Sequence, residues 1–412
     1  MKTILKASVA LAALVGSAGV GLADCGISAG SVRILSNDFE ALHVVASAAE
    51  TCASGTVTVT KNQTTEHKNI QVAALTTNPA TYTVAMVANN SIIPLLNDGL
   101  VRPLDDLVAK YGQNLQESQL IRIDGKVMAI AFMANAQHFY YRKDLLEQAG
   151  LAVPKSYEDV LAAAKVLREK GIMQNPLAAN DLPGWDLAQE FVNMYTGMGG
   201  EFFAPGSAEA TIANDKGVAA LTMMKALTGY MGPEFITYET NGTKPLWEAS
   251  EIGMMTQWGS RASAFIDPAG PAPAIAAATA FSAAPTVGGG DIPATTLWWD
   301  GFVIAKNISD ADAEASFQAM MAGISPDILA QNSSVAAWLI KGYEPTPAAV
   351  GVFESVLGGA RPYPMLPYMG TLHTALGNNL AEFMQGQESA EQALADATAA
   401  YVTAAKEGGF LN

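Results

Sequence analysis

Short apolar runs and longer segments with helical spacing alternate along the N-terminal part of the chain. Apolar and β-branched residues concentrated at 32–35, 56–60 and 82–87 predict three strands. Apolar residues recurring every three to four positions at 39–53 and 68–75 predict a helix after each of the first two strands. This order predicts an α/β fold with a mostly parallel sheet and helices on both faces.

Similar patterns continue toward the C-terminus. They predict helices over 157–170, 217–230, 310–322, 370–385 and 389–406, and strands over 252–256 and 297–306. Residues 267–293 are rich in Ala, Pro and Gly, which predicts an irregular connection. A chain of 412 residues is too long for one ordinary hydrophobic core, so we expect two domains.

Residues 1–23 have the pattern of a secretory signal peptide. Two lysines precede an apolar run over 7–20, and Gly21-Leu22-Ala23 places small residues at the −3 and −1 positions of a cleavage site. We therefore expect an exported, periplasmic protein. Two alternatives stay open. One is a membrane anchor, which the short and Gly-interrupted run disfavours, and the other is a lipoprotein, which the acidic residue before Cys25 disfavours.

The composition limits the partners that this chain is expected to have. The formal net charge is −16 and no basic stripe is present to neutralise phosphates, which argues against nucleic acid. After the signal sequence no apolar run is long enough to span a membrane, so we expect a soluble protein. We also expect it to act as a monomer. Cys25 and Cys52 are expected to form a disulfide in an oxidising compartment. No cysteine or histidine has metal-site spacing, so neither metal nor cofactor is expected.

Four motifs occur in order in the remaining sequence. They are the stretch with Asp124-Gly125-Lys126, Lys143-Asp144-Leu145-Leu146, Ala149-Gly150-Leu151 and Pro154, and the segments IGMMTQW at 252–258, GFVIAK at 301–306 and ARPYP at 360–364. By these motifs the chain resembles the family 1 extracellular solute-binding proteins of ABC importers, the group that includes maltose-binding protein and glycerophosphodiester-binding members. Two positions depart from the family pattern, since Arg142 stands where Asn is usual and Ala131 where Pro is common.

The resemblance implies a fold and a function. The expected fold is a two-lobed periplasmic binding protein of type II, in which each lobe is a central sheet flanked by helices and a hinge joins the lobes. Lobe 1 is expected to comprise 24–133 plus 300–348 and lobe 2 to comprise 138–297 plus 349–412, with hinge crossings near 134–137, 298–300 and 345–350. Such a protein captures a solute between its lobes and delivers it to the transmembrane permease, without catalysing a reaction.

Polar residues directly after two predicted strands are candidates for ligand contact. Asn37 and Asp38 follow the first strand, and Asn89 and Asn90 follow the third. Ligands of open α/β sheets bind beyond the carboxyl ends of parallel strands, and amide or carboxylate groups suit vicinal hydroxyls. The alternative is that these side chains only cap helices. The resemblance adds Asn135, in the first crossing, at a position that contacts ligand in the family.

Aromatic and cationic residues complete the candidate site. Trp185, Trp258, Trp298 and Trp299 are candidates because sugar rings stack on indole, and Trp258 aligns with a sugar-stacking position of the family. Adjacent strand residues face opposite sides, so only one of Trp298 and Trp299 is expected to face the cleft. Asp300 follows them, and Arg261 and Arg361 are candidates for bidentate hydrogen bonds to ligand oxygens.

Three ligand and function classes compete. A neutral carbohydrate, namely an oligosaccharide, monosaccharide or polyol, is favoured by the overall acidity and the lack of a basic cluster. An anionic ligand such as a glycerophosphodiester or a sulfonated sugar would depend on Arg261 and Arg361. A periplasmic glycoside-acting enzyme is the remote alternative, with Asp38, Glu40 or Asp300 as its carboxylates. The G-x-S-x-G match at 26–30 precedes a strand rather than following one, so it is not a nucleophile elbow.

Overall fold

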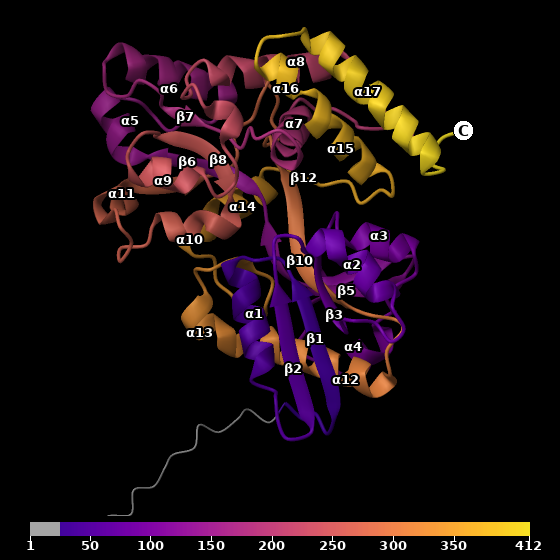
Figure 1. Cartoon of the computed structure of the whole chain (residues 1–412). Coiled ribbons are helices and arrows are strands. Elements are labelled where there is room, and N and C mark those ends of the chain that lie inside the picture. The colour runs from indigo at the N-terminus through magenta and orange to yellow at the C-terminus, as the bar shows by residue number, and fades with distance from the viewer. Residues whose placement is uncertain (1–24) are drawn as a thin grey trace, which may run out of the picture.

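The computed structural model describes residues 25–412, and the signal peptide predicted over residues 1–23 lies outside the described residues. The chain forms two lobes, each built on its own sheet (Figure 1). We refer to the eight-stranded sheet with its helices as lobe 1, and to the four-stranded sheet with its helices as lobe 2. This arrangement confirms the predicted α/β class with two lobes. None of the helices in the described part of the chain is long and apolar enough to cross a membrane.

The sheet of lobe 1 has a parallel half and an antiparallel half. Its strands are β1 (Gly30–Ser36), β2 (Val57–Gln63), β3 (Val84–Ala88), β4 (Leu120–Ile123), β5 (Lys126–Asn135), β10 (Thr296–Ile304), β11 (Ala337–Trp338) and β12 (Arg361–Pro362). β1 pairs in parallel with β2 and β3, whereas β10 pairs antiparallel with both β3 and β5. The prediction of a mostly parallel sheet is therefore wrong, because the two strands that cross between the lobes run in opposite directions within the sheet.

Alternating side chains on these strands form two cores, one on each face of the sheet. On β10, Phe302 and Ile304 join the cluster under α1 (Glu40–Glu50) and α12 (Asp310–Gly323). Val303, between them, joins the cluster that contains residues of α2 (His67–Thr76) and α3 (Ile92–Asn97). The period of two along the strand thus sorts neighbouring residues to opposite faces. The short helices α4 (Asp105–Tyr111) and α13 (Leu329–Asn332) complete this lobe.

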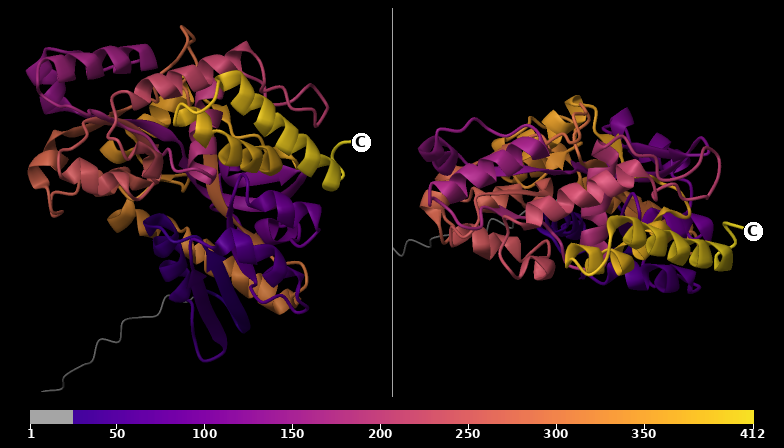
Figure 2. Two further views of the ribbon diagram at one scale, coloured as in Figure 1. Left: turned by 45° about the horizontal axis from the view of Figure 1, so that its top comes forward. Right: turned by 90° about the horizontal axis from the view of Figure 1, so that it is seen from above.

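Lobe 2 surrounds a smaller sheet with more helices. Its strands are β6 (Gln137–Arg142), β7 (Leu177–Ala178), β8 (Met254–Trp258) and β9 (Thr279–Ser282). Its helices are α5 (Lys143–Ala149), α6 (Tyr157–Glu169), α7 (Trp185–Gly197), α8 (Asp215–Thr228), α9 (Thr243–Glu248), α10 (Ala262–Phe265), α11 (Pro273–Ala278), α14 (Val350–Leu357), α15 (Met369–Asn379), α16 (Ala381–Met384) and α17 (Ala390–Glu407). The C-terminal helices α15 and α17 pack together on the outside of this lobe (Figure 2).

Two predictions about lobe 2 need correction. Residues 267–293 are not wholly irregular, since they contain α11, which starts at Pro273, and β9, which pairs with β6. The pairing partner of β9 lies far away in sequence, so local composition did not reveal the strand. The helix predicted over 370–385 is divided into α15 and α16 at Leu380.

Two strands run side by side between the lobes. β5 continues through Ala136 into β6, and β10 returns in the opposite direction, with Trp298 paired to Asn135. The side chain of Trp298 belongs to the core of lobe 2, whereas Phe302, four residues later, belongs to lobe 1. Figure 1 shows β10 passing from one body to the other. The residue boundaries of the lobes given above stay a prediction.

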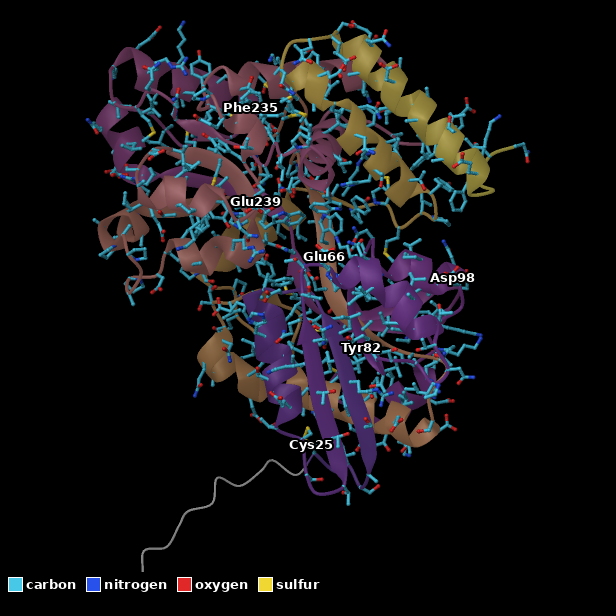
Figure 3. The ribbon with its side chains drawn as sticks, in the orientation of Figure 1. Cys25, Glu66, Tyr82, Asp98, Phe235 and Glu239 are labelled. Carbon is cyan, nitrogen blue, oxygen red and sulfur yellow. A yellow bond between two sulfur atoms is a disulfide. The ribbon has the colours of Figure 1, made fainter. Side chains whose placement is uncertain are left out.

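The disulfide between Cys25 and Cys52 is present, which confirms the pairing expected from the sequence. It ties the start of the described chain to the residue just after the C-cap of α1, with the two Cα atoms 5.5 Å apart. Figure 3 shows Cys25 at the end of lobe 1 that faces away from lobe 2. The bond therefore staples the outer end of lobe 1.

Candidate ligand-binding cleft

A cleft with a volume of about 440 Å³ lies between the lobes. Lobe 1 lines it with Asn37, Asp38, Phe39, Thr65, Glu66, His67, Lys68, Asn69, Ala88, Asn90 and Asp300. Lobe 2 lines it with Trp185, Asp186, Thr240, Asn241, Trp258, Ser260, Arg261 and Trp298, and Asn135 contributes from the crossing. Glu66, at the start of α2, and Glu239 both lie near the junction of the lobes (Figure 3).

The structure brings most of the predicted site residues together. Those that line the cleft are Asn37, Asp38, Asn90, Asn135, Trp185, Trp258, Arg261, Trp298 and Asp300. The loops after β1 and β3 meet at one edge of the sheet because parallel strands end on the same side. Lobe 2 adds its residues from the start of α7 and from the end of β8.

Three predicted residues do not line the cleft. Asn89 is buried, where its Nδ2 donates to the Leu297 carbonyl at 3.2 Å and its Oδ1 accepts from the Trp299 N–H at 2.8 Å. Trp299 packs against the core on the far face of β10, so it is Trp298 that faces the cleft. Arg361 forms a 2.8 Å ion pair with Glu201. Asn89 thus fastens β10 to the end of β3 from behind the cleft.

Three tryptophans form an aromatic wall on the lobe 2 side. Trp185 lies roughly parallel to Trp258 with centroids 6.0 Å apart, and Trp298 meets both rings edge to face at 5.9 and 5.7 Å. His373 stacks on Trp185 at 5.1 Å and supports it from the core. Trp185 is 36% exposed, compared with 8% for Trp258 and 6% for Trp298. Trp185 is therefore the ring with the most free surface for a ligand.

Asn135 connects the crossing to this wall. Its Oδ1 accepts hydrogen bonds from the Ala136 N–H at 3.0 Å and the Ser260 N–H at 3.1 Å. Its Nδ2 donates to the Ser260 Oγ at 3.2 Å. Because Ser260 lies two residues after Trp258, the Asn135 amide holds the short 3₁₀ segment Gly259–Arg261 against the hinge strand.

A lysine that the sequence analysis missed reaches across the cleft. The Nζ of Lys68, from α2 in lobe 1, lies 4.8 Å from the centroid of the Trp185 ring in lobe 2. The surrounding protein limits hydration of the ammonium group and lowers the pKa of Lys68, while Asp300 and Asp186 act in the opposite direction. Burial raises the pKa of Asp300 to about 7, although Lys68 opposes this shift. Burial also raises the pKa of Asp186.

The charges that line the cleft are predominantly negative. Asp38, Glu66, Asp186 and Asp300 carry carboxyl groups, whereas the cationic side chains are Lys68 and Arg261. The guanidinium of Arg261 lies 5.8 Å from the centroid of the Phe39 ring, so it also contacts the opposite lobe. Among residues 25–412, no group of three or more His, Cys, Asp and Glu side chains is arranged to hold a metal ion.

Some of these lining residues carried a usable sequence signal and others did not. Residues 64–69 follow the carboxyl end of β2, so the rule that selected the loops after β1 and β3 would also have selected Lys68. Thr240 and Asn241 lie in a lobe 2 loop with no such signal. Thr240 donates to the Asp186 carboxylate through its N–H at 3.2 Å and its Oγ1 at 3.3 Å.

The model of the bacterial extracellular solute-binding protein family matches residues 54–322, which is more than half of the chain. The chain belongs to this family. Among curated relatives of this binding protein, a probable ABC transporter-binding protein of Deinococcus radiodurans is 26% identical over 144 residues, 33% of this chain and 34% of the relative. An uncharacterized ABC transporter extracellular-binding protein of Pyrococcus horikoshii is 28% identical over 81 residues, 19% of each chain. The chain thus spans about a third or less of these relatives.

Solved structures resemble the binding protein over nearly its whole length. Maltose-bound MalE3 of T. maritima superposes with a TM-score of 0.78 at 19% identity, covering 91% of this chain and 100% of that chain. A solute-binding protein from Agrobacterium radiobacter K84 in complex with ribitol has a TM-score of 0.76 at 21% identity, covering 90% and 97%. A protein from Agrobacterium vitis S4 with bound D-mannitol has a TM-score of 0.75 at 19% identity, covering 93% and 100%. These similarities confirm the two-lobed fold.

Proposed function

We propose that this protein is the solute-binding component of an ABC importer and that it captures a neutral carbohydrate in the cleft. An oligosaccharide, a monosaccharide and a polyol all belong to this class. The observation that carries the proposal is the pairing of an aromatic wall, led by Trp185, with a polar wall that contains Asn37 and Asn90. Sugars and polyols need both, because their C–H faces stack on indole while their hydroxyls need hydrogen-bonding partners.

The charge of the cleft favours a neutral ligand over an anionic one. Lys68 and Arg261 are the cationic side chains of the lining, and the acidic side chains outnumber them. Arg361, the other cation expected to serve an anionic ligand, is paired with Glu201 outside the lining. A glycerophosphodiester or sulfonated sugar would bring a further negative charge into a lining that also holds Asp38 and Glu66, and this repulsion opposes binding.

Similar proteins support the carbohydrate class without deciding it for this chain. The solved structures of similar fold include proteins bound to maltose, ribitol and D-mannitol. The curated relatives are described as ABC transporter-binding proteins, which supports a permease as the partner. We further propose that residues 1–23 direct export to the periplasm, where the binding protein acts as a monomer and catalyses no reaction.

The proposed cycle uses the two lobes as rigid bodies. Residues 24–133 plus 300–348 move against residues 138–297 plus 349–412 about the crossings near 134–137, 298–300 and 345–350. A ligand that contacts both walls binds the closed form more tightly than the open form and so shifts the population toward closure. The closed form then docks on the permease. Micromolar affinity corresponds to about 8 kcal/mol of binding free energy.

A thermal-shift screen tests the ligand class. The exported form of the protein is heated with neutral sugars, polyols, glycerophosphodiesters and sulfonated sugars in separate samples. A ligand at 100 times its Kd stabilises the folded protein by about 2.7 kcal/mol, which raises Tm by at least a degree or two in a chain of this size. We expect a shift with at least one neutral sugar or polyol. Shifts with anionic compounds alone would overturn the proposal.

A further inference from the structure

Buried polar groups behind the aromatic wall link Trp298 to the first crossing strand. The indole N–H of Trp298 donates to the Thr296 Oγ1 at 3.0 Å, and this hydroxyl donates to the Asn193 Oδ1 at 2.9 Å. The Asn193 Nδ2 then donates to the Gln137 Oε1 at 3.1 Å. Gln137 is the first residue of β6, so one arm of this relay runs from a cleft tryptophan to the hinge.

A second arm of the relay runs from Glu190 to Trp258. The Glu190 Oε1 accepts from the Asn180 Nδ2 at 2.9 Å, and the Asn180 Oδ1 accepts from the Gln257 Nε2 at 3.0 Å. The Gln257 Oε1 accepts from the backbone N–H of Trp258 at 2.8 Å. Gln137, at the end of the first arm, also stabilises the charged form of Glu190, so this carboxyl group lies between the two arms.

We propose that Glu190 is a positioning residue that holds Trp258 and Trp298 in place relative to the hinge strand through this relay. It contacts no part of the cleft itself, since it lies on the interior side of α7 beneath the wall. The inference deepens the proposed function, and its consequence for ligand affinity rests on that function. Its consequence for the positions of the tryptophans does not rest on the proposed function, because the tryptophans are linked to Glu190 in the ligand-free protein.

The surroundings of Glu190 give its carboxyl group two states near neutral pH. Burial and the charge of Asp181 raise the pKa of Glu190 to about 8, and Asp186 acts in the same direction. Burial raises the pKa of Asp181 to about 7. Tyr157, on α6, also lies beside this pair, and burial raises its pKa far above neutrality.

Ionisation of Glu190 changes the forces within the relay, because the hydrogen bond from Asn180 strengthens while the charge of Asp181 repels the carboxylate. The Asp181 Oδ2 is buried without a hydrogen-bond partner, and Asp181 and Glu190 both line a small internal cavity of about 30 Å³. Once both carboxyl groups are charged, the interior holds two neighbouring negative charges with little solvation. This repulsion, together with stronger hydrogen bonds to the Glu190 carboxylate, changes the positions of Asn180 and Gln137, and the change reaches the tryptophans.

The experiment follows the tryptophans of the ligand-free, exported protein by near-UV circular dichroism and emission between pH 6 and pH 9.5. Wild-type protein is compared with Glu190→Gln, which keeps the size and the acceptor oxygen but cannot ionise. Glu147→Gln, on the exposed side of α5, is the matched control for loss of one carboxylate. Lys68 and Asp300 are unchanged in all three proteins, so the difference between wild type and Glu190→Gln reports on Glu190.

We expect a tryptophan transition with a midpoint near pH 8 in wild type and in Glu147→Gln, and its loss in Glu190→Gln. Asp181→Asn should move the midpoint to lower pH, because it removes the charge that raises the pKa of Glu190. The near-UV spectrum of Glu190→Leu should differ from that of wild type at every pH. The spectrum of Glu190→Gln should match that of wild type below pH 8.

The proposal is overturned if the tryptophan signal of Glu190→Gln changes with pH as it does in wild type. It is also overturned if Glu190→Leu keeps the wild-type near-UV spectrum. If Glu190→Leu does not fold, the midpoints of the tryptophan transition in wild type and in Asp181→Asn still test the proposal. Equal midpoints in these two proteins would contradict it. None of these measurements contains a ligand. Failure of the carbohydrate screen therefore leaves this result intact, and a flat tryptophan profile leaves the proposed function intact.

Discussion

The two walls of the cleft are built on different principles. The lobe 1 wall is polar and is made by loops at the carboxyl ends of β1, β2 and β3, with exposed groups such as Asp38 and Glu66. The lobe 2 wall is aromatic and rests on a buried hydrogen-bonded relay that contains Glu190. For the proposed carbohydrate ligand we therefore expect a division of labour, in which lobe 2 supplies most of the binding free energy and lobe 1 selects hydroxyl positions.

The largest expected effect on affinity is at Trp185. Trp185→Ala should cost about 2 kcal/mol of binding free energy, or roughly 30-fold in Kd, because this ring has the most free surface in the wall. Calorimetric titration with a saccharide found in the screen measures it. Trp299→Phe is the matched control, since Trp299 lies on the opposite face of β10. Equal losses in the two variants would remove Trp185 from the site.

Loss of a polar group in lobe 1 should weaken binding less. Asn37→Ala should cost about 1 kcal/mol, or roughly fivefold in Kd, since it removes a hydrogen bond that water partly replaces. The same titration should show a less favourable binding enthalpy. If Asn37→Ala weakened binding more than Trp185→Ala, the proposed division of labour between the walls would be reversed.

A smaller effect is expected from pH, through Asp300. A ligand hydroxyl that donates to this carboxylate binds its ionised form, so affinity should rise modestly between pH 6 and pH 8, around the Asp300 pKa of about 7. Asp300→Asn should remove the contribution of Asp300 to this dependence. Folding stability should respond in the opposite sense. The folded-state pKa is raised, so the stabilising contribution is present at low pH and is lost as pH rises from about 4 to 7. Chemical denaturation at several pH values checks this sign, with Asp300→Asn flattening the profile.

The smallest expected effect on affinity comes from the disulfide. Replacing Cys25 and Cys52 together by Ser should lower the free energy of unfolding by about 3 kcal/mol, because the bond closes a loop of 27 residues. It should leave Kd unchanged within about twofold, since neither cysteine lines the cleft. A large loss of affinity in a folded double variant would show that the outer end of lobe 1 is coupled to the site.

The polar wall was the easier one to predict from the sequence, because its signal is local. A polar residue after a predicted parallel strand has a known place, which selected Asn37, Asp38 and Asn90. Asn89 carries the same signal, yet its amide is used by β10, whose pairing joins residues 210 positions apart. No local pattern indicates such a partner.

The aromatic wall was predictable only in part. Strand alternation correctly separated Trp298 from Trp299, but it could not rank Trp185 above Trp258, since that ranking depends on how the core of lobe 2 covers each ring. The relay behind the wall was not anticipated at all. Its hydrogen bonds join Asn193 to Gln137 across 56 residues and Asn193 to Thr296 across 103, separations at which side-chain spacing carries no information.

The most direct test of the central claim is calorimetric titration of the exported wild-type protein with neutral sugars, polyols and their anionic counterparts at one pH. The account predicts that a neutral carbohydrate binds with a Kd near the micromolar range and that its phosphorylated or sulfonated counterpart binds at least tenfold more weakly. Tighter binding of the anionic counterpart would contradict the account, because it would show that Lys68 and Arg261 outweigh the four carboxyl groups of the cleft.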